Sequence, residues 1–215
     1  MTLSERKQIS NWTELMLKDH GILRLCWHNL YQISYEAWRS NQPTPGRVAT
    51  AARNGIKTII NLRGPRDDGG WRLEHEACQQ HGLKLVDFTI RSRAVPDAKN
   101  IHEARELFET VEYPILMHCK SGADRAGIMA ALYLLLRQSA CLDEAAKQLS
   151  FKYLHVRQAK TGLLDAFLET YRPFEAQGVS FMDWVDHHLD TAEITSKFQS
   201  KHWANRLIDS ILRRE

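Results

Sequence analysis

The chain has 215 residues, a length that suits one domain with extensions. Its 29 Lys and Arg residues nearly balance 26 Asp and Glu residues, and the net charge of +3 is too small for the basic footprint of a nucleic-acid-binding protein. The four cysteines (26, 78, 119 and 141) are irregularly spaced and include no CxxC pair, which excludes a disulfide framework and favours a reducing, cytoplasmic location. The polar first ten residues and the short apolar run at 128–136 predict neither a signal peptide nor a membrane-spanning helix.

The middle of the chain alternates helical and extended patterns. Helices are predicted from Pro45 to a stop at Asn54-Gly55 and at 71–81, 97–111, 125–136, 143–151 and 159–171, and strands at 56–62, 83–90 and 113–117. Loops are predicted at 63–70 and 91–96. This alternation predicts an α/β fold with a central, mostly parallel sheet of four to five strands flanked by helices. We expect a core at 34–172 with helical extensions at 1–33 and 173–215.

Both extensions have helical patterns, at 12–31 and 180–214, and they hold four of the six tryptophans. In the last segment, apolar residues recur at helical spacing while basic residues fill much of the remainder. One interpretation is that these helices pack on the core. The alternatives are an amphipathic helix, with Phe198, Trp203 and basic side chains lying on an anionic membrane, and a dimer contact.

One segment carries a chemical mechanism. His118-Cys119-Lys120-Ser121-Gly122-Ala123-Asp124-Arg125 lies between a predicted strand and a predicted apolar helix. A loop in that position directs successive backbone amides inward at a helix N-terminus, and both features favour an anion. The same partial positive charge stabilises a cysteine thiolate, and the planar guanidinium of Arg125 can bind two phosphate oxygens. These are the parts needed for phosphoryl transfer to sulfur.

This segment resembles the HC-x5-R signature of the cysteine-dependent phosphatases, in particular their compact dual-specificity type. Trp38-Arg39-Ser40-Asn41-Gln42-Pro43 is similar to the entry strand of that family, and Asn61-Leu62-Arg63 ends a strand as it often does there. The resemblance covers about residues 34–171. It implies a dual-specificity-phosphatase-like fold and metal-independent hydrolysis of phosphomonoesters, without a cofactor, through a cysteinyl-phosphate intermediate.

The resemblance also assigns roles within the loop. Cys119 corresponds to the nucleophile, and Arg125 binds the substrate phosphate and stabilises the transition state. Residues Lys120, Ser121, Gly122, Ala123 and Asp124 complete the phosphate-binding loop, where Gly122 permits a close approach of the backbone. His118 is expected to orient the loop through a hydrogen bond. Ala126 departs from the Ser or Thr that many members have after the arginine.

The general acid, which protonates the leaving oxygen, is harder to assign. The family usually supplies an Asp from the loop that here reads Arg91-Ser92-Arg93-Ala94-Val95-Pro96, which contains none. Asp124 is the first candidate, since myotubularin-like phosphatases place an Asp before the arginine of this loop. Asp97 is the second, although its position also suits a helix N-cap. Asp67 and Asp68 remain further candidates for the acid. Asp87 lies within a strand pattern, where its side chain is expected to point at a neighbouring residue and not at the substrate.

The substrate has two candidate classes. A phosphorylated protein, bearing phosphotyrosine or phosphoserine, is the family default. A phosphorylated lipid or inositol phosphate is favoured by Lys120 and by the cations Arg91 and Arg93, with Arg63 as a further substrate contact. Gln158 is a candidate for positioning the hydrolytic water. A weakly active phosphate-binding module is the remaining alternative.

Overall fold

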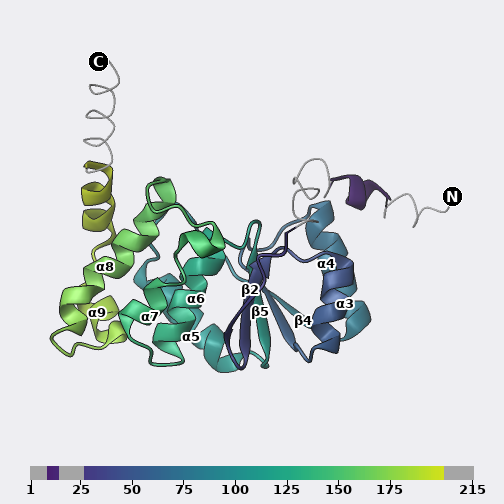
Figure 1. Cartoon of the computed structure of the whole chain (residues 1–215), viewed down its shortest axis with the longest axis horizontal. Coiled ribbons are helices and arrows are strands. Elements are labelled where there is room, and N and C mark those ends of the chain that lie inside the picture. Colours follow the sequence, from purple (N-terminus) through teal and green to yellow (C-terminus); the bar gives the residue numbers. More distant parts are fainter. Residues whose placement is uncertain (1–8, 15–26, 201–215) are drawn as a thin grey trace, which may run out of the picture.

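The computed structural model describes residues 9–14 and 27–200, and Figure 1 shows their arrangement. Five strands form one sheet in the order β1-β2-β5-β3-β4. They are β1 Tyr31–Ser34, β2 Ala37–Asn41, β3 Thr58–Asn61, β4 Lys84–Asp87 and β5 Ile115–Cys119. β1 is antiparallel to β2, and the other neighbours are parallel. The predicted mostly parallel α/β sheet is therefore confirmed, with five strands.

Helices cover both faces of the sheet, as Figure 1 shows. α3 Pro45–Arg53 and α4 Gly69–His81 pack on the face that carries Ile59 and Leu116. α5 Ala98–Thr110 and α6 Asp124–Leu136 pack on the opposite face, against Ile60 and Met117. Successive strand residues point to opposite faces, so two apolar residues in a row on β3 and β5 supply both layers.

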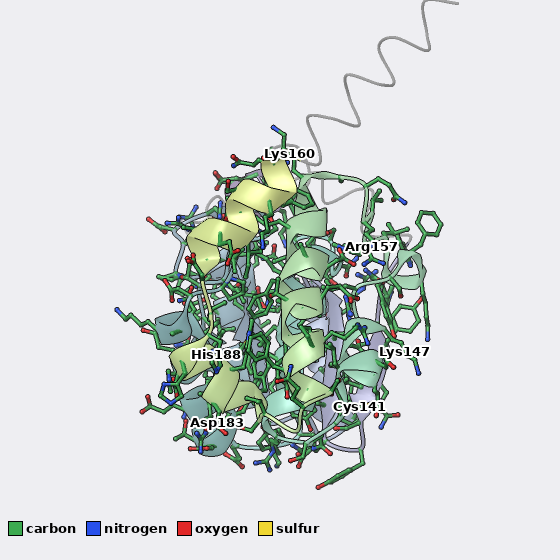
Figure 2. All side chains as sticks on the ribbon, turned by 90° about the vertical axis from the view of Figure 1, so that its left-hand side faces the viewer. Cys141, Lys147, Arg157, Lys160, Asp183 and His188 are labelled. Carbon is green, nitrogen blue, oxygen red and sulfur yellow. The ribbon has the colours of Figure 1, made fainter. Side chains whose placement is uncertain are left out.

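α6 is the central helix of the larger layer, and every residue from Ala126 to Leu135 is buried. The helices α7 Leu142–Ala146, α8 Leu163–Glu175 and α9 Phe181–His187 surround it, and Figure 2 shows α8 and α9 from their outer side. The apolar run at 128–136 is thus a core helix, as predicted. Within the described residues, no helix is both long enough and apolar enough to cross a membrane.

Two predicted helices differ from the observed ones. The helix expected at 143–151 stops at Ala146, where the amides of Lys147, Gln148 and Leu149 donate to carbonyls three residues earlier instead of four. The short 3-10 turn η2, Phe151–Tyr153, follows. The helix expected at 159–171 begins with a second 3-10 turn, η3 Lys160–Gly162, and continues as α8 to Glu175.

The ends of the chain are partly described. Residues 9–13 are helical, but Tyr31 begins β1 and is not part of a helix. At the other end, Trp184 is 1% exposed and Ile194 is 5% exposed within the core, and Phe198 packs against it. This part of the C-terminal extension therefore packs on the core, as the first interpretation predicted. Residues 15–26 and 201–215, including Trp203, lie outside the described residues, and the boundaries at 33/34 and 172/173 stay predictions.

Candidate active site

The candidate site lies at the C-terminal edge of the three central strands, where parallel α/β sheets bind their ligands. Cys119 is the last residue of β5 and pairs in register with Asn41 of β2, while His118 pairs with Asn61 of β3. α6 begins only five residues later, at Asp124. The Cys119 residue is 2% exposed, so its sulfur lies at the bottom of the loop.

The carbonyls of the loop backbone are directed away from the sulfur. The carbonyl of Lys120 accepts from Gln42 N at 3.4 Å, and that of Ser121 accepts from Asn29 Nδ2 at 2.9 Å. Since a carbonyl and the following amide of one peptide point in opposite directions, the amides point inward. Gly122 N accordingly donates to Cys119 Sγ at 3.3 Å. The result is a nest of donors around the sulfur.

Arg39 holds the next two carbonyls of the loop. Its Nη2 donates to Gly122 O at 2.7 Å and to Ala123 O at 2.9 Å, while Nη1 donates to Gln148 Oε1 at 3.0 Å as well as to the Gln148 carbonyl. The guanidinium also lies 4.0 Å from the centre of the Tyr153 ring. Burial disfavours the charged form and lowers the pKa of Arg39 to about 10, which still leaves the group charged at neutral pH.

Position 122 requires glycine for two reasons, the conformation of its backbone and the lack of room for a side chain. Its φ is +75°, and a Cβ placed there would lie 2.7 Å from Asn41 N and 2.7 Å from Ser40 C. Those atoms are backbone of β2, which cannot move aside cheaply. The structure thus shows a close approach of the loop to β2 at Gly122, and the approach of this backbone to a phosphate stays a prediction.

A buried polar chain lies behind the loop. His118 Nε2 is 2.6 Å from Glu74 Oε1, and both side chains are fully buried. Glu74 Oε2 accepts from Gln42 Nε2 at 3.2 Å, and Gln42 Oε1 in turn accepts from Arg63 Nη1. Since a buried carboxylate requires partners, this chain fixes His118 beside the cysteine. It supports the prediction that His118 orients the loop.

Arg125 differs from these internal arginines. It lies on the first turn of α6 and is half-buried, and its side chain forms no hydrogen bond or ion pair with the residues that the structure describes. Both Nη groups of Arg39 donate to carbonyl oxygens of Gly122, Ala123 and Gln148, and its buried Nε has no hydrogen-bond partner among the described residues. The donors of Arg125 are not engaged in this way, so they are available to an anion.

The carboxylates considered as general acid each have a partner. Asp97 is the N-cap of α5 and accepts from Asn100 N at 2.8 Å, as its position suggested. Asp68 caps α4, Asp67 accepts from Arg72, and Asp87 accepts from Trp71 Nε1. Asp124 lies in the loop, is 26% exposed at its side chain, and accepts from His155 Nδ1 at 2.8 Å.

The other residues predicted to contact the substrate have different surroundings in the structure. Arg63 is drawn into the buried chain, with 4% of its side chain exposed. Arg91 lines a separate groove of about 710 Å³ between β4 and α5, together with Asp97, and no residue of 119–125 lines that groove. Arg93 and Gln158 are exposed, Gln158 in the segment between η2 and η3. The structure therefore does not bring Arg91 together with Cys119.

Sequence reasoning missed the residues that hold the loop from outside, namely Arg39, Gln42, Glu74, His155 and Asp165. Only Glu74 left a signal, because it is a charged residue between Leu73 and Ala77 on the buried face of a predicted helix. The others come from segments far from the loop in sequence, and their residue types occur equally often at surfaces.

Comparisons with known proteins agree with this geometry. A family model described as DSP-PTPase phosphatase fused to NAD+ kinase matches residues 5–162. Among curated proteins, the dual specificity protein phosphatase TpbA of Pseudomonas aeruginosa (strain UCBPP-PA14) is 32% identical over 121 residues, which cover 54% of this chain and 52% of TpbA. The chain thus spans about half the length of the curated relatives it matches.

Solved structures share the fold. The crystal structure of P. aeruginosa TpbA has a TM-score of 0.55 at 25% identity, covering 66% of this chain and 84% of that one. The core catalytic domain of the PP-IP phosphatase SIW14 from S. cerevisiae has a TM-score of 0.52 at 18% identity, covering 69% and 93%. Because the family model spans most of the chain and includes the whole Cys119 loop, the chain belongs to the family of DSP-PTPase phosphatases fused to NAD+ kinase.

Proposed function

We propose that this protein hydrolyses phosphomonoesters with Cys119 as nucleophile and Arg125 as the phosphate-binding cation. The observation that carries this proposal is the loop backbone, whose carbonyls are held outward so that its amides face the cysteine sulfur. Such a nest can donate hydrogen bonds to the three equatorial oxygens of the phosphoryl group in the transition state. Membership of the phosphatase family supports the same reaction.

The reaction proceeds in two displacements. The Cys119 thiolate attacks phosphorus, the ester P–O bond breaks with its electron pair, and the leaving oxygen takes a proton from an acid. A water molecule then attacks the phosphocysteine and gives its proton to a base. The P–S bond breaks, inorganic phosphate is released and the thiolate is restored. The amides of the loop and Arg125 stabilise the charge in both steps.

For the substrate we propose a phosphorylated protein, with phosphotyrosine or phosphoserine at the loop. The curated relative TpbA, which is 32% identical over 121 residues, is named a dual specificity protein phosphatase. An inositol phosphate or phosphorylated lipid was favoured by Lys120, which lies within the loop, and by Arg91 and Arg93, of which Arg91 lines the groove beside α5. The similarity to TpbA is therefore the observation that supports the protein substrate over the lipid.

A direct test compares the wild-type protein with Cys119→Ser and Arg125→Lys. Hydrolysis of p-nitrophenyl phosphate should vanish in the serine variant, because its hydroxyl does not ionise at neutral pH, while phosphopeptide binding should persist. Arg125→Lys should lose at least ~10²-fold in kcat/KM, since lysine cannot form the bidentate fork. Near wild-type turnover by the serine variant would sink the proposal.

The substrate class is tested separately, by phosphate release from phosphopeptides, phosphoinositides and inositol phosphates at equal concentration. A higher kcat/KM for phosphopeptides is the expected result, and a preference for inositol compounds would overturn the substrate assignment without affecting the chemistry. If the wild-type protein binds phosphopeptides yet releases no phosphate from any substrate, it is a binding module.

A further inference from the structure

A histidine outside the loop joins it to a distant helix through two carboxylates. His155 Nδ1 is 2.8 Å from Asp124 Oδ1, and His155 Nε2 is 2.7 Å from Asp165 Oδ2. Asp124 is the first residue of α6, and Asp165 lies in the first turn of α8. The histidine side chain is fully buried, with 0% exposure. An imidazole that bonds a carboxylate through each nitrogen must carry both protons, so this geometry requires the imidazolium.

The segment that carries His155 is itself tied to the phosphate loop. Tyr153, two residues earlier, lies under the guanidinium of Arg39, and its carbonyl accepts from Asn29 Nδ2 at 3.1 Å. The same Asn29 amide group donates to Ser121 O. His155 is therefore one of three connections between this segment and the loop. It is the one among them that depends on a protonated imidazole.

We propose that His155 is a positioning residue for the phosphate-binding loop, holding Asp124 in place against Asp165 as a charged clamp. This inference rests on the proposed phosphatase function. Asp124 adjoins Arg125, so the clamp fixes the start of α6 and with it the direction in which the Arg125 side chain leaves the helix. A displacement of that guanidinium by about 1 Å would be costly, because the transition state requires near-ideal placement of its donors.

The surroundings of His155 keep it charged. Burial disfavours the imidazolium, but the hydrogen bonds to Asp124 and Asp165 and their negative charges outweigh burial and raise the pKa of His155 to about 9. The charged and titratable groups around His155 are Asp124 from α6, Asp165 from α8 and Arg157, whose Nε is 3.7 Å from Asp165 Oδ1. Arg39 interacts electrostatically with Asp124 and also with Tyr153 and Cys119. The negative charges of Asp124 and Asp165, one at each ring nitrogen, thus dominate the electrostatic environment of His155.

The clamp gives Asp124 a different task from the one its sequence position suggested. Its Oδ1 accepts a hydrogen bond from a cation, which is the arrangement of an anchored carboxylate and not of a free proton donor. The leaving oxygen then takes its proton from an acid other than Asp124. Removal of Asp124 should therefore slow all esters alike.

The experiment measures kcat/KM for p-nitrophenyl phosphate between pH 7 and 10.5, because this ester needs little protonation of its leaving group. Wild-type activity should fall along an alkaline limb with a midpoint near 9, the pKa of His155. In Asp165→Asn, the loss of one carboxylate should move that midpoint down by about one pH unit or more. In His155→Gln, activity should be lower by roughly 10- to 100-fold at pH 7 and the limb should be absent.

A matched control is His102→Gln, which removes an imidazole–carboxylate pair at 2.6 Å between His102 of α5 and Asp186 of α9, away from the loop. Its pH profile should match the wild type. An unchanged limb in His155→Gln, or an unshifted midpoint in Asp165→Asn, would overturn the clamp. Should either variant fail to fold, imidazole 15N NMR of the wild-type protein tests the clamp instead. One histidine should titrate near pH 9, and the proposal is refuted if no histidine does.

The same NMR measurement separates this inference from the proposed function. If p-nitrophenyl phosphate is not hydrolysed at all, the phosphatase assignment fails, yet the titration of His155 still reports on the clamp. If the ester is hydrolysed through Cys119 but orthovanadate inhibits His155→Gln as strongly as the wild type at pH 7, the clamp does not position the loop. We expect at least a 10-fold weaker inhibition in that variant.

Discussion

Arg39 Nη2 donates a hydrogen bond of 2.7 Å to the carbonyl of Gly122, a residue 83 positions later in the chain. Through this contact, a strand residue determines which way the backbone of the phosphate-binding loop faces. A bound anion receives nothing from Arg39 directly. The arginine instead removes carbonyl oxygens from the site, which would otherwise repel phosphate.

Arg39→Lys should both destabilise the protein and reduce its activity. A lysine keeps the charge but cannot reach Gly122, Ala123 and Gln148 together, so buried carbonyls lose their donors. We expect a loss of about 3 kcal/mol in the free energy of unfolding, measured by urea denaturation. The exposed Arg53, which donates to Thr50 on α3, offers a control: Arg53→Lys should change stability by less than about 0.5 kcal/mol. Equal effects of the two substitutions would contradict the role of Arg39.

Gly122→Ala should be severely destabilising for the loop. The added Cβ would lie within 2.8 Å of three backbone atoms of β2, and the φ of +75° disfavours any residue with a side chain. We expect kcat/KM for p-nitrophenyl phosphate to fall by at least ~10²-fold and thermal unfolding to occur at lower temperature. Gly46→Ala is the matched control, since a Cβ on that α3 residue meets nothing within 4 Å and alanine favours helices. That variant should retain full activity.

The proton donor can be located by leaving-group dependence. A variant that lacks the acid should impair a tyrosyl phosphate, a poor leaving group, far more than a nitrophenyl phosphate. The clamp predicts equal losses for both esters in Asp124→Asn, and Asp97→Asn, which changes a helix cap in the separate groove beside α5, should not impair the tyrosyl ester selectively. The measurement is kcat/KM for the two esters at one pH. A selective loss in Asp124→Asn would restore that residue as the acid.

The stability of the fold should also depend on His155. Its pKa is raised from the ordinary 6.5 to about 9, so the folded state binds a proton more tightly than the unfolded state. The resulting stabilisation is fully present below pH 6.5 and is lost as pH rises through about 9. A shift of this size corresponds to at most about 3 kcal/mol. Urea denaturation at pH 6 and pH 10 should show this difference, and it should be smaller in His155→Gln.

The parts of the site that are local could be predicted from the sequence. The order of strand, loop and helix around Cys119 follows from apolar runs and one glycine, so the loop and its two chemical residues are recognisable in the sequence alone. The supports could not be predicted, because Arg39 and His155 approach the loop only after the sheet and the layer of α6 and α8 have assembled. Periodicity reports which face a residue occupies, and not which distant partner it meets.

The helix expected at 143–151 shows the same limit. Its pattern is helical, and the local preferences of Gln148 do not oppose a helix. After Ala146 the backbone bonds nevertheless change to carbonyls three residues earlier. The carbonyl of Gln148 then accepts from Arg39, a partner 109 positions away that no local pattern reveals.

The position of β5 in the sheet has a consequence for the order in which the molecule is built. Its neighbours β2 and β3 are both made earlier by the ribosome, and Ala37 and Thr58 each pair with Ile115. β5 is translated last of the three and must therefore insert between β2 and β3. Such long-range parallel pairing is slow to form. Cys119 lies at the end of that strand. The nucleophile therefore reaches its place only when β5 has paired with both neighbours, and we expect catalytic turnover in refolding to appear no earlier than that pairing.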